Sequence, residues 1–110
     1  MRGSAIRLGT LTIPATGNQF SPAIVLEGKG LRGLGIFAPA GAQAGTISVD
    51  VSADGGETYR TLQSGGSDVG AAAGKCLVLD TIVFTHLRMA TSSAAENELV
   101  FQIAGVEDIT

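Results

Sequence analysis

The chain has 110 residues, of which 45% are hydrophobic and 15% charged, and its net charge is −3. This length fits one domain, since domains commonly hold ~100–150 residues, and the composition excludes a disordered chain. The 16 glycines follow no three-residue repeat, which excludes collagen and predicts many turns between short elements.

Two kinds of targeting segment are missing from the sequence. No apolar run approaches the ~20 residues that span a bilayer. Residues 1–20 also lack the basic start and apolar core of a signal peptide. We therefore expect a protein that is made in the cytoplasm of its host and has no membrane partner.

Short runs of alternating apolar and β-branched residues recur along the chain, and each run ends at Gly, Pro, Asn or Asp. The clearest run is 46–52, where Ile47, Val49 and Val51 share one face of a strand. The predicted strands, in chain order, are 8–13, 20–26, 33–38, 46–52, 58–62, 76–79, 85–90 and 98–104, with 106–109 as a tail strand.

The predicted fold class is all-β. Gly or Pro interrupts every candidate helical window, so we expect no helix longer than one short turn at 80–84. Short strands separated by turns are typical of two sheets that each bury one face. We therefore expect residues 1–110 to form a single antiparallel β-sandwich of about eight strands, with the jelly roll among its possible arrangements. Residues 1–7 are expected to be an extended N-terminal arm.

Several motifs imitate ligand-binding loops but lack an essential part. Residues 28–33 match G-x-G-x-x-G, yet no helix follows to meet a pyrophosphate. Residues 70–76 resemble a P-loop with one spacer residue too few. Residues 50–61 open like a calcium loop, but the twelfth position is Thr61 instead of Glu. Turns and hairpins are the better interpretation of all three segments.

The sequence offers no catalytic group and no metal site. His86 is the only histidine and has no nucleophile in a Gly-x-Ser-x-Gly elbow beside it, so we interpret it as structural or as a surface residue. Cys76 is the only cysteine, and its apolar neighbours Leu77 and Val78 predict a small core residue. We expect no enzyme activity, no cofactor and no bound metal.

One turn carries an informative pattern. Residues 52–59 resemble an Asp box, S-x-D-x-G-x-T followed by an aromatic residue, which in sialidases and related propellers lies away from the active site. We expect the carboxylate to accept backbone hydrogen bonds from the two glycines, the hydroxyls to brace the arms, and the ring to pack on the hairpin. The residues of this predicted structural hairpin are Ser52, Asp54, Gly55, Gly56, Thr58 and Tyr59.

Charge is distributed unevenly along the chain. Residues 41–110 carry three basic residues against nine acids, whereas residues 1–40 carry four basic residues against Glu27 alone. The basic excess is too small, and the five aromatic residues are too few, for a nucleic-acid partner. An acidic protein partner fits better. The candidate partner-binding residues are Arg2, Arg7, Lys29 and Arg32.

The stretch from 11 to about 106 resembles small proteins encoded among the morphogenesis genes of tailed bacteriophages. The resemblance rests on a threonine-rich first strand at 10–15, Leu-Gly-Ile at 34–36, the strand and turn at 47–59, Leu-Asp at 79–80 and Leu-Arg at 87–88. The acidic pair at 107–108 departs from the pattern, where a neutral strand end is usual.

This resemblance implies a β-sandwich virion protein, most simply a capsid decoration protein that binds the major capsid protein. A homo-oligomer is expected because the chain has little polar material to cover both outer faces. A trimer is favoured because capsid threefold axes match it. The alternatives are a tail or tail-fibre component and a carbohydrate-binding β-sandwich module. The absence of Trp and the single Tyr argue against the sugar-binding alternative.

Overall fold

The computed structural model describes residues 2–14, 19–40, 46–64, 66–80, 82–92 and 98–109. Every regular element in these ranges is a β-strand, which confirms the all-β prediction. The strands are β1 (Arg2–Ile13), β2 (Ile24–Val25), β3 (Leu31–Phe37), β4 (Ile47–Ser52), β5 (Arg60–Thr61), β6 (Gln63–Ser64), β7 (Ser67–Asp68), β8 (Gly70–Ala71), β9 (Cys76–Leu79), β10 (His86–Thr91) and β11 (Leu99–Ile109).

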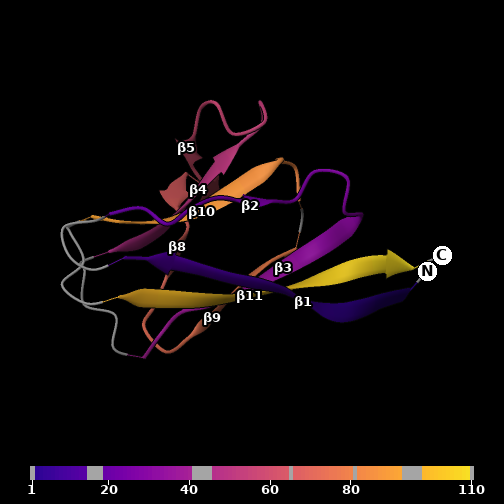
Figure 1. Cartoon of the computed structure of the whole chain (residues 1–110), viewed down its shortest axis with the longest axis horizontal. Helices are drawn as coiled ribbons and strands as arrows, with labels where there is room; N and C mark the ends of the chain where they lie inside the picture. The colour runs from indigo at the N-terminus through magenta and orange to yellow at the C-terminus, as the bar shows by residue number, and fades with distance from the viewer. Residues whose placement is uncertain are drawn as a thin grey trace.

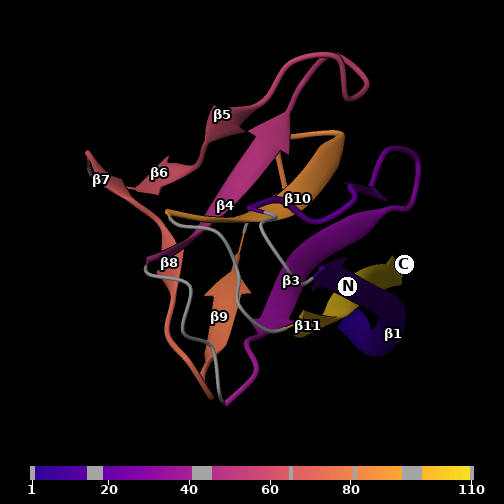
Figure 2. The same ribbon diagram turned by 60° about the vertical axis from the view of Figure 1, so that its left-hand side comes forward.

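The strands form two main antiparallel sheets that pack face to face (Figures 1 and 2). We call the four-stranded sheet β1-β11-β3-β9 sheet A. We call the sheet β2-β10-β4-β5, in which β8 also pairs with β4, sheet B. The short hairpin β6-β7 lies between β5 and β8 in the chain. The predicted antiparallel β-sandwich is therefore correct.

The order of strands within the sheets is that of a jelly roll. β5 and β8 pair with opposite ends of β4 and so share one position in sheet B. If β5 and β8 are counted as one strand and the β6-β7 hairpin is left out, the described strands can be renumbered 1 to 8 in chain order. In this numbering β9, β10 and β11 become strands 6, 7 and 8. Sheet A then has the order 1-8-3-6 and sheet B the order 2-7-4-5. This interleaving of two Greek keys defines the jelly roll.

The core lies between the two sheets and follows from strand alternation. On β4, Ile47 and Val49 are buried on the inner face, while Ser48 and Asp50 point to the outer face of sheet B. Neither sheet could remain folded alone, because each hides its apolar face against the other. The largest fully buried side chains among the described residues are Ile13, Ile36, Val49, Leu87, Met89, Phe101 and Ile103.

The two terminal strands are longer than predicted. β1 begins at Arg2 and pairs with β11 along its whole length, so residues 2–7 are extended but belong to sheet A. The two strands predicted at 98–104 and 106–109 are one strand, β11. Gly105 lies within this strand, between the two predicted segments. A Cβ at this position would come within 2.9 Å of Leu8 Cδ1, so the missing side chain makes room for that leucine.

Other predicted elements are shorter or different. Only Ile24–Val25 of the predicted strand 20–26 is a strand, and Phe20 adds an isolated bridge to Ala90. The strand predicted at 58–62 is reduced to β5, and β6, β7 and β8 were not predicted. Residues 80 and 82–84 form no helical turn. The turn expected at 16–18 lies outside the described residues.

Candidate functional site

The middle of the outer face of sheet A consists mainly of small residues. The pairing register places Arg7, Ala104, Gly35 and Val78 in one row across all four strands. In the next row toward the chain termini, Val106 of β11 lies between β1 and Gly33 of β3. Residues paired directly across antiparallel strands point to the same face. The middle of this face therefore presents glycine and alanine where strands usually present larger side chains.

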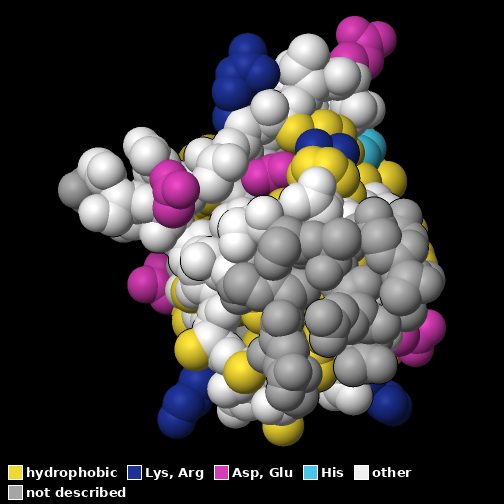
Figure 3. All heavy atoms as spheres, turned by 90° about the vertical axis from the view of Figure 1, so that its left-hand side faces the viewer, with side chains coloured by type: hydrophobic (Ala, Val, Ile, Leu, Met, Phe, Trp, Pro, Cys, Tyr) yellow, Lys and Arg dark blue, Asp and Glu magenta, His cyan; other side chains and the backbone are white. Residues whose placement is uncertain are grey.

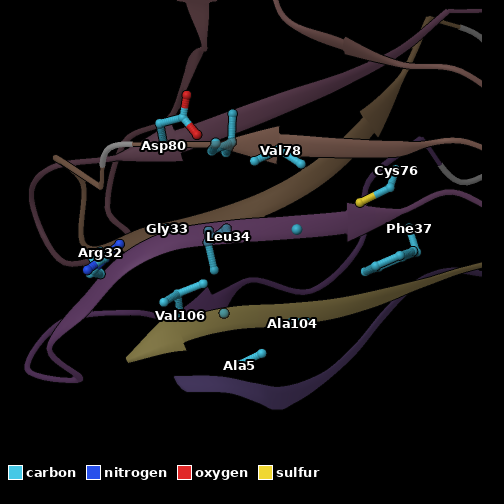
Figure 4. Close-up of a pocket in the computed structure, with 13 residues that line it drawn as sticks. Ala5, Arg32, Gly33, Leu34, Phe37, Cys76, Val78, Asp80, Ala104 and Val106 are labelled. Carbon is cyan, nitrogen blue, oxygen red and sulfur yellow. The ribbon is translucent and has the colours of Figure 1, made fainter. Parts of the chain in front are cut away.

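This arrangement leaves a hollow of about 420 Å³ on the outer face (Figure 4). Gly33, Gly35 and Ala104 are among the residues that line it, and Val78 and Phe37 rise beside them. These two large side chains are 64% and 46% exposed, although both are apolar. A second hollow of about 400 Å³, which also includes Arg7, shares Ala104 and Phe37 with the first. The two hollows make one continuous apolar surface, which we call the sheet A face.

Charged side chains lie at the margins of the sheet A face. Arg32 lines the hollow and is seen with Asp80 at the end opposite Phe37 and Cys76 in Figure 4. Arg7 belongs to the edge strand β1, and Asp80 follows the other edge strand, β9. Three strand spacings of ~4.8 Å separate those edges by about 14 Å, too far for an ion pair. The face thus carries Arg7 at its β1 margin and Asp80 at its β9 margin, with Arg32 at the same end as Asp80 and the exposed Lys75 just before β9.

The structure brings together two of the four predicted partner-binding residues. Arg7 and Arg32 are exposed and line hollows of the sheet A face. Lys29 is exposed in the turn before β3, outside both hollows. Arg2 begins β1, and its side chain lies outside the described part of the structure. The acids Glu27 and Glu107 are exposed at the same end of sheet A as Lys29, so that end is not purely basic.

Cys76 is not a core residue, contrary to the sequence prediction. It lies opposite Phe37 on the outer face of sheet A and is exposed. Its neighbours Leu77 and Leu79 point inward instead. The apolar run 76–79 could be placed in either register, because a shift of one residue exchanges the two faces of a strand. Cys76 therefore adds an accessible thiol to the sheet A face.

The Asp-box-like turn is held by side-chain hydrogen bonds. Ser52 is buried, and its Oγ donates to Asp54 Oδ1 at 2.7 Å while accepting from the amide of Gly56 at 2.9 Å. Asp54 accepts from the Thr58 amide at 3.0 Å and from the Thr58 hydroxyl at 2.5 Å. The Gly55 amide donates to Thr85 Oγ1 at 3.3 Å.

These contacts agree with the predicted brace and correct one detail of it. The hydroxyls of Ser52 and Thr58 do brace the turn through Asp54. The glycine amides, however, donate to hydroxyl oxygens and not to the carboxylate. Gly55 and Gly56 both have positive φ, 79° and 91°, a backbone conformation that favours glycine at these two positions of the turn.

The hydrogen bonds change the acidity of the Asp54 carboxyl group. The hydroxyl and amide of Thr58, followed by the hydroxyl of Ser52, hold the pKa of the Asp54 carboxyl well below its usual range. These donors stabilise the charged form. Asp54 is thus an ionised structural acceptor at neutral pH.

Tyr59 makes a contact that the sequence did not reveal. The guanidinium of Arg88 lies between the rings of Tyr59 and Phe20, 4.2 Å from each centroid. Arg88 Nε and Nη2 also donate to Asp50 Oδ2 at 3.3 Å, and Thr61 donates to the other carboxylate oxygen. We call this arrangement the Arg88 stack. It covers the outer face of sheet B with a charge-neutral group.

His86 lies beside the Arg88 stack and has no catalytic partner in the described residues. Its Nδ1 is 3.0 Å from Thr85 Oγ1, and its ring would touch a Cβ placed on Gly56. Figure 3 shows this histidine in cyan next to a basic side chain held between hydrophobic ones. The described residues contain no group of three His, Cys, Asp or Glu that could hold a metal ion. No helix among them is long and apolar enough to cross a membrane.

Comparison with known proteins finds solved structures of similar fold but no matching protein family. No protein-family model matches the chain, and no curated protein matches it. Among solved structures, the SPBc2 prophage-derived protein YomS has a TM-score of 0.60 at 8% identity, covering 96% of this chain and 93% of that one. A CBM32 module from a Clostridium perfringens family 31 glycoside hydrolase has a TM-score of 0.46 at 16% identity, covering 81% and 67%. A Bacillus endospore appendage protein of disulfide-linked pili has a TM-score of 0.43 at 11% identity, covering 98% and 93%. This chain therefore shares its whole β-sandwich fold with a prophage-derived protein.

Proposed function

We propose that this chain is a structural protein of a tailed-phage virion, of the capsid decoration type, and that it acts as a homo-oligomer. The observation that carries the proposal is the sheet A face. Contiguous exposed apolar surface marks protein contact sites, and on this face Phe37 is 46% and Val78 64% exposed beside the two hollows. A protein with such a face is expected to work by binding other proteins.

The fold and its likeness to a prophage-derived protein support the phage assignment. Jelly rolls serve in viral capsid proteins, but also in lectins, so the fold alone does not choose between these functions. A sugar-binding module would present open aromatic platforms. Here the chain has no Trp and one Tyr. Arg88 covers one ring face of Tyr59 and one of Phe20, which is 48% exposed. A virion contact protein is the better account.

The proposed protein has no enzymatic activity and uses no cofactor. The site chemistry that we describe is structural, because Asp54 and Ser52 bond to the turn itself. Its proposed partners are the major capsid protein and further copies of itself, with a trimer favoured by capsid symmetry. Its proposed location is the virion, after synthesis in the bacterial cytoplasm.

Co-sedimentation with capsids stripped of this protein tests the proposal. We expect wild-type protein to sediment with capsids and to release as salt rises, since screening weakens charge contacts. The variant in which Arg2, Arg7, Lys29 and Arg32 are replaced by Gln should bind more weakly at low salt. The control Arg60→Gln removes an exposed charge from sheet B and should bind normally.

Two outcomes would redirect the assignment. Protein that never sediments with capsids but sediments with purified tails would make it a tail component. Protein that binds neither, yet is retained on an immobilised host-surface polysaccharide, would favour the sugar-binding alternative.

A further inference from the structure

A protruding apolar edge lies next to the sheet A face. Val83 is 77% exposed, more than the other large hydrophobic side chains in the described residues. It lines a groove of about 430 Å³ with Val78 and Asp80, beside the free side of β9. We call Val83, Val78 and Asp80 the β9 edge. Val83 itself does not line the hollow of the sheet A face.

We propose that the β9 edge of one copy inserts into the sheet A face of a second copy, in a head-to-tail contact. This contact covers both exposed apolar surfaces at once. If two sheet A faces packed against each other, Val83 would remain in water, because it lies outside the hollow. The hollow has a floor of glycine and alanine and a volume of about 420 Å³, which suits branched aliphatic side chains.

Charge complementarity supports the same arrangement. The β9 edge carries Asp80, and Asp68 of the neighbouring β6-β7 hairpin is also exposed. The far margin of the sheet A face carries Arg7, which Asp80 of its own chain cannot reach across the sheet. A neighbouring copy can supply that acid. In the head-to-tail contact, Asp80 of one copy and Arg7 of the next can pair as opposite charges.

A head-to-tail contact either closes into a ring or continues as a filament. The threefold capsid sites of the proposed function select the ring of three. The inference rests on the sheet A face being a contact surface, but its test needs no capsid. A ring that fails to bind capsids would overturn the proposed virion function and leave the ring, whereas a monomer that binds capsids would overturn the ring and the homo-oligomeric part of the proposed function and leave the virion role.

The test measures the mass of the free protein by sedimentation velocity and light scattering. We expect wild type at about three times the 11.1-kDa chain mass, and an about threefold lower mass for Val83→Asp and Gly35→Val. A Cβ on Gly35 meets only ordinary contacts, at 3.4 Å from Phe37 and 3.5 Å from Cys76, so this variant should fold and fill the hollow. The matched control is Val25→Asp, which is 47% exposed on sheet B and should stay oligomeric.

Mixing the two monomeric variants gives the sharpest result. Val83→Asp keeps an intact face and Gly35→Val keeps an intact edge, so an equimolar mixture should form a two-chain complex and no ring. Cys76 is a native probe of the hollow. Its alkylation should be roughly tenfold faster in Val83→Asp than in wild type. A monomeric wild type, or a Val83→Asp variant with wild-type mass and Cys76 protection, would overturn the inference.

Discussion

Ser52→Ala tests whether the Asp-box-like turn stabilises the fold. Ser52 is buried, and its Oγ makes three hydrogen bonds within the turn: it accepts from the amides of Asp54 and Gly56 and donates to the Asp54 carboxylate. Removing it leaves the half-buried Gly56 amide without its acceptor. A lost hydrogen bond costs about 1 kcal/mol and an orphaned buried donor about 1–3 kcal/mol. The two Ser52 bonds to backbone amides therefore predict a loss of roughly 2 kcal/mol.

Urea unfolding monitored by far-UV circular dichroism measures this loss. Tryptophan fluorescence cannot be used, because the chain contains no Trp. For a domain of this size, ~2 kcal/mol should lower the melting temperature by roughly 8 °C. The matched control is Ser64→Ala, an exposed serine on β6, which should change stability by less than ~0.5 kcal/mol. If Ser52→Ala were as stable as that control, the turn would not be a structural brace and its hydroxyl would need another role.

Three further predictions follow from the same structure. The pKa of Asp54 is lower in the folded chain than its ordinary value near 3.8. The ionised carboxylate therefore stabilises the fold fully above that value, and this contribution is lost as the pH falls below it. Stability measured across an acid titration should show this loss in wild type and not in Asp54→Asn. Arg88→Met leaves Asp50, which is nearly buried, without its cation and should cost roughly 2 kcal/mol in urea unfolding, less than a fully buried pair. Phe101→Ala should cost ~3–5 kcal/mol in the same assay because Phe101 is fully buried, while Phe37→Ala on the sheet A face should cost about 1 kcal/mol because Phe37 is 46% exposed.

The strands that could be predicted are those with clean alternation. Ile47, Val49 and Val51 alternate with polar residues, and β4 was placed within one residue of its observed start. The pattern works because sheet B has one buried face and one face that meets water. The Asp-box-like turn was also predictable, since its bonds join residues at most four positions apart.

The elements that could not be predicted depend on partners distant in sequence. The first half of β1 has a mixed pattern, and it is extended because β11 pairs with it nearly a hundred residues later. The Arg88 stack joins Phe20, Tyr59 and Arg88 from three segments, and no local pattern indicates such a meeting. Sequence reasoning named Tyr59 for packing on its own hairpin and left Arg88 without a role.

The sheet A face was missed because its signal is a lack of side chains. Gly33 and Gly35 were placed in the predicted strand 33–38, and Gly33 also in the turn motif 28–33, but no surface was inferred from their missing side chains; neither has a positive φ. In β3 they alternate with the buried Leu34 and Ile36, which is the pattern of a strand with an empty outer face. Glycine at alternate positions of a strand, next to an apolar edge, is therefore a signal for a surface that another backbone or side chain approaches closely.

Substitutions on the two outer faces of the sandwich should affect different properties: stability on sheet B and association on sheet A. On sheet B, Arg88 is held by Asp50 and two rings, so the Arg88 stack contributes to stability. On sheet A, the hollow contributes little to stability because its floor has few side chains to pack. Changes in the Asp-box-like turn should therefore lower the free energy of unfolding without altering oligomer mass. Changes in the hollow should lower the oligomer mass and leave the unfolding free energy of the dissociated monomer unchanged. A variant of Ser52 that dissociated the oligomer at native stability would contradict this division.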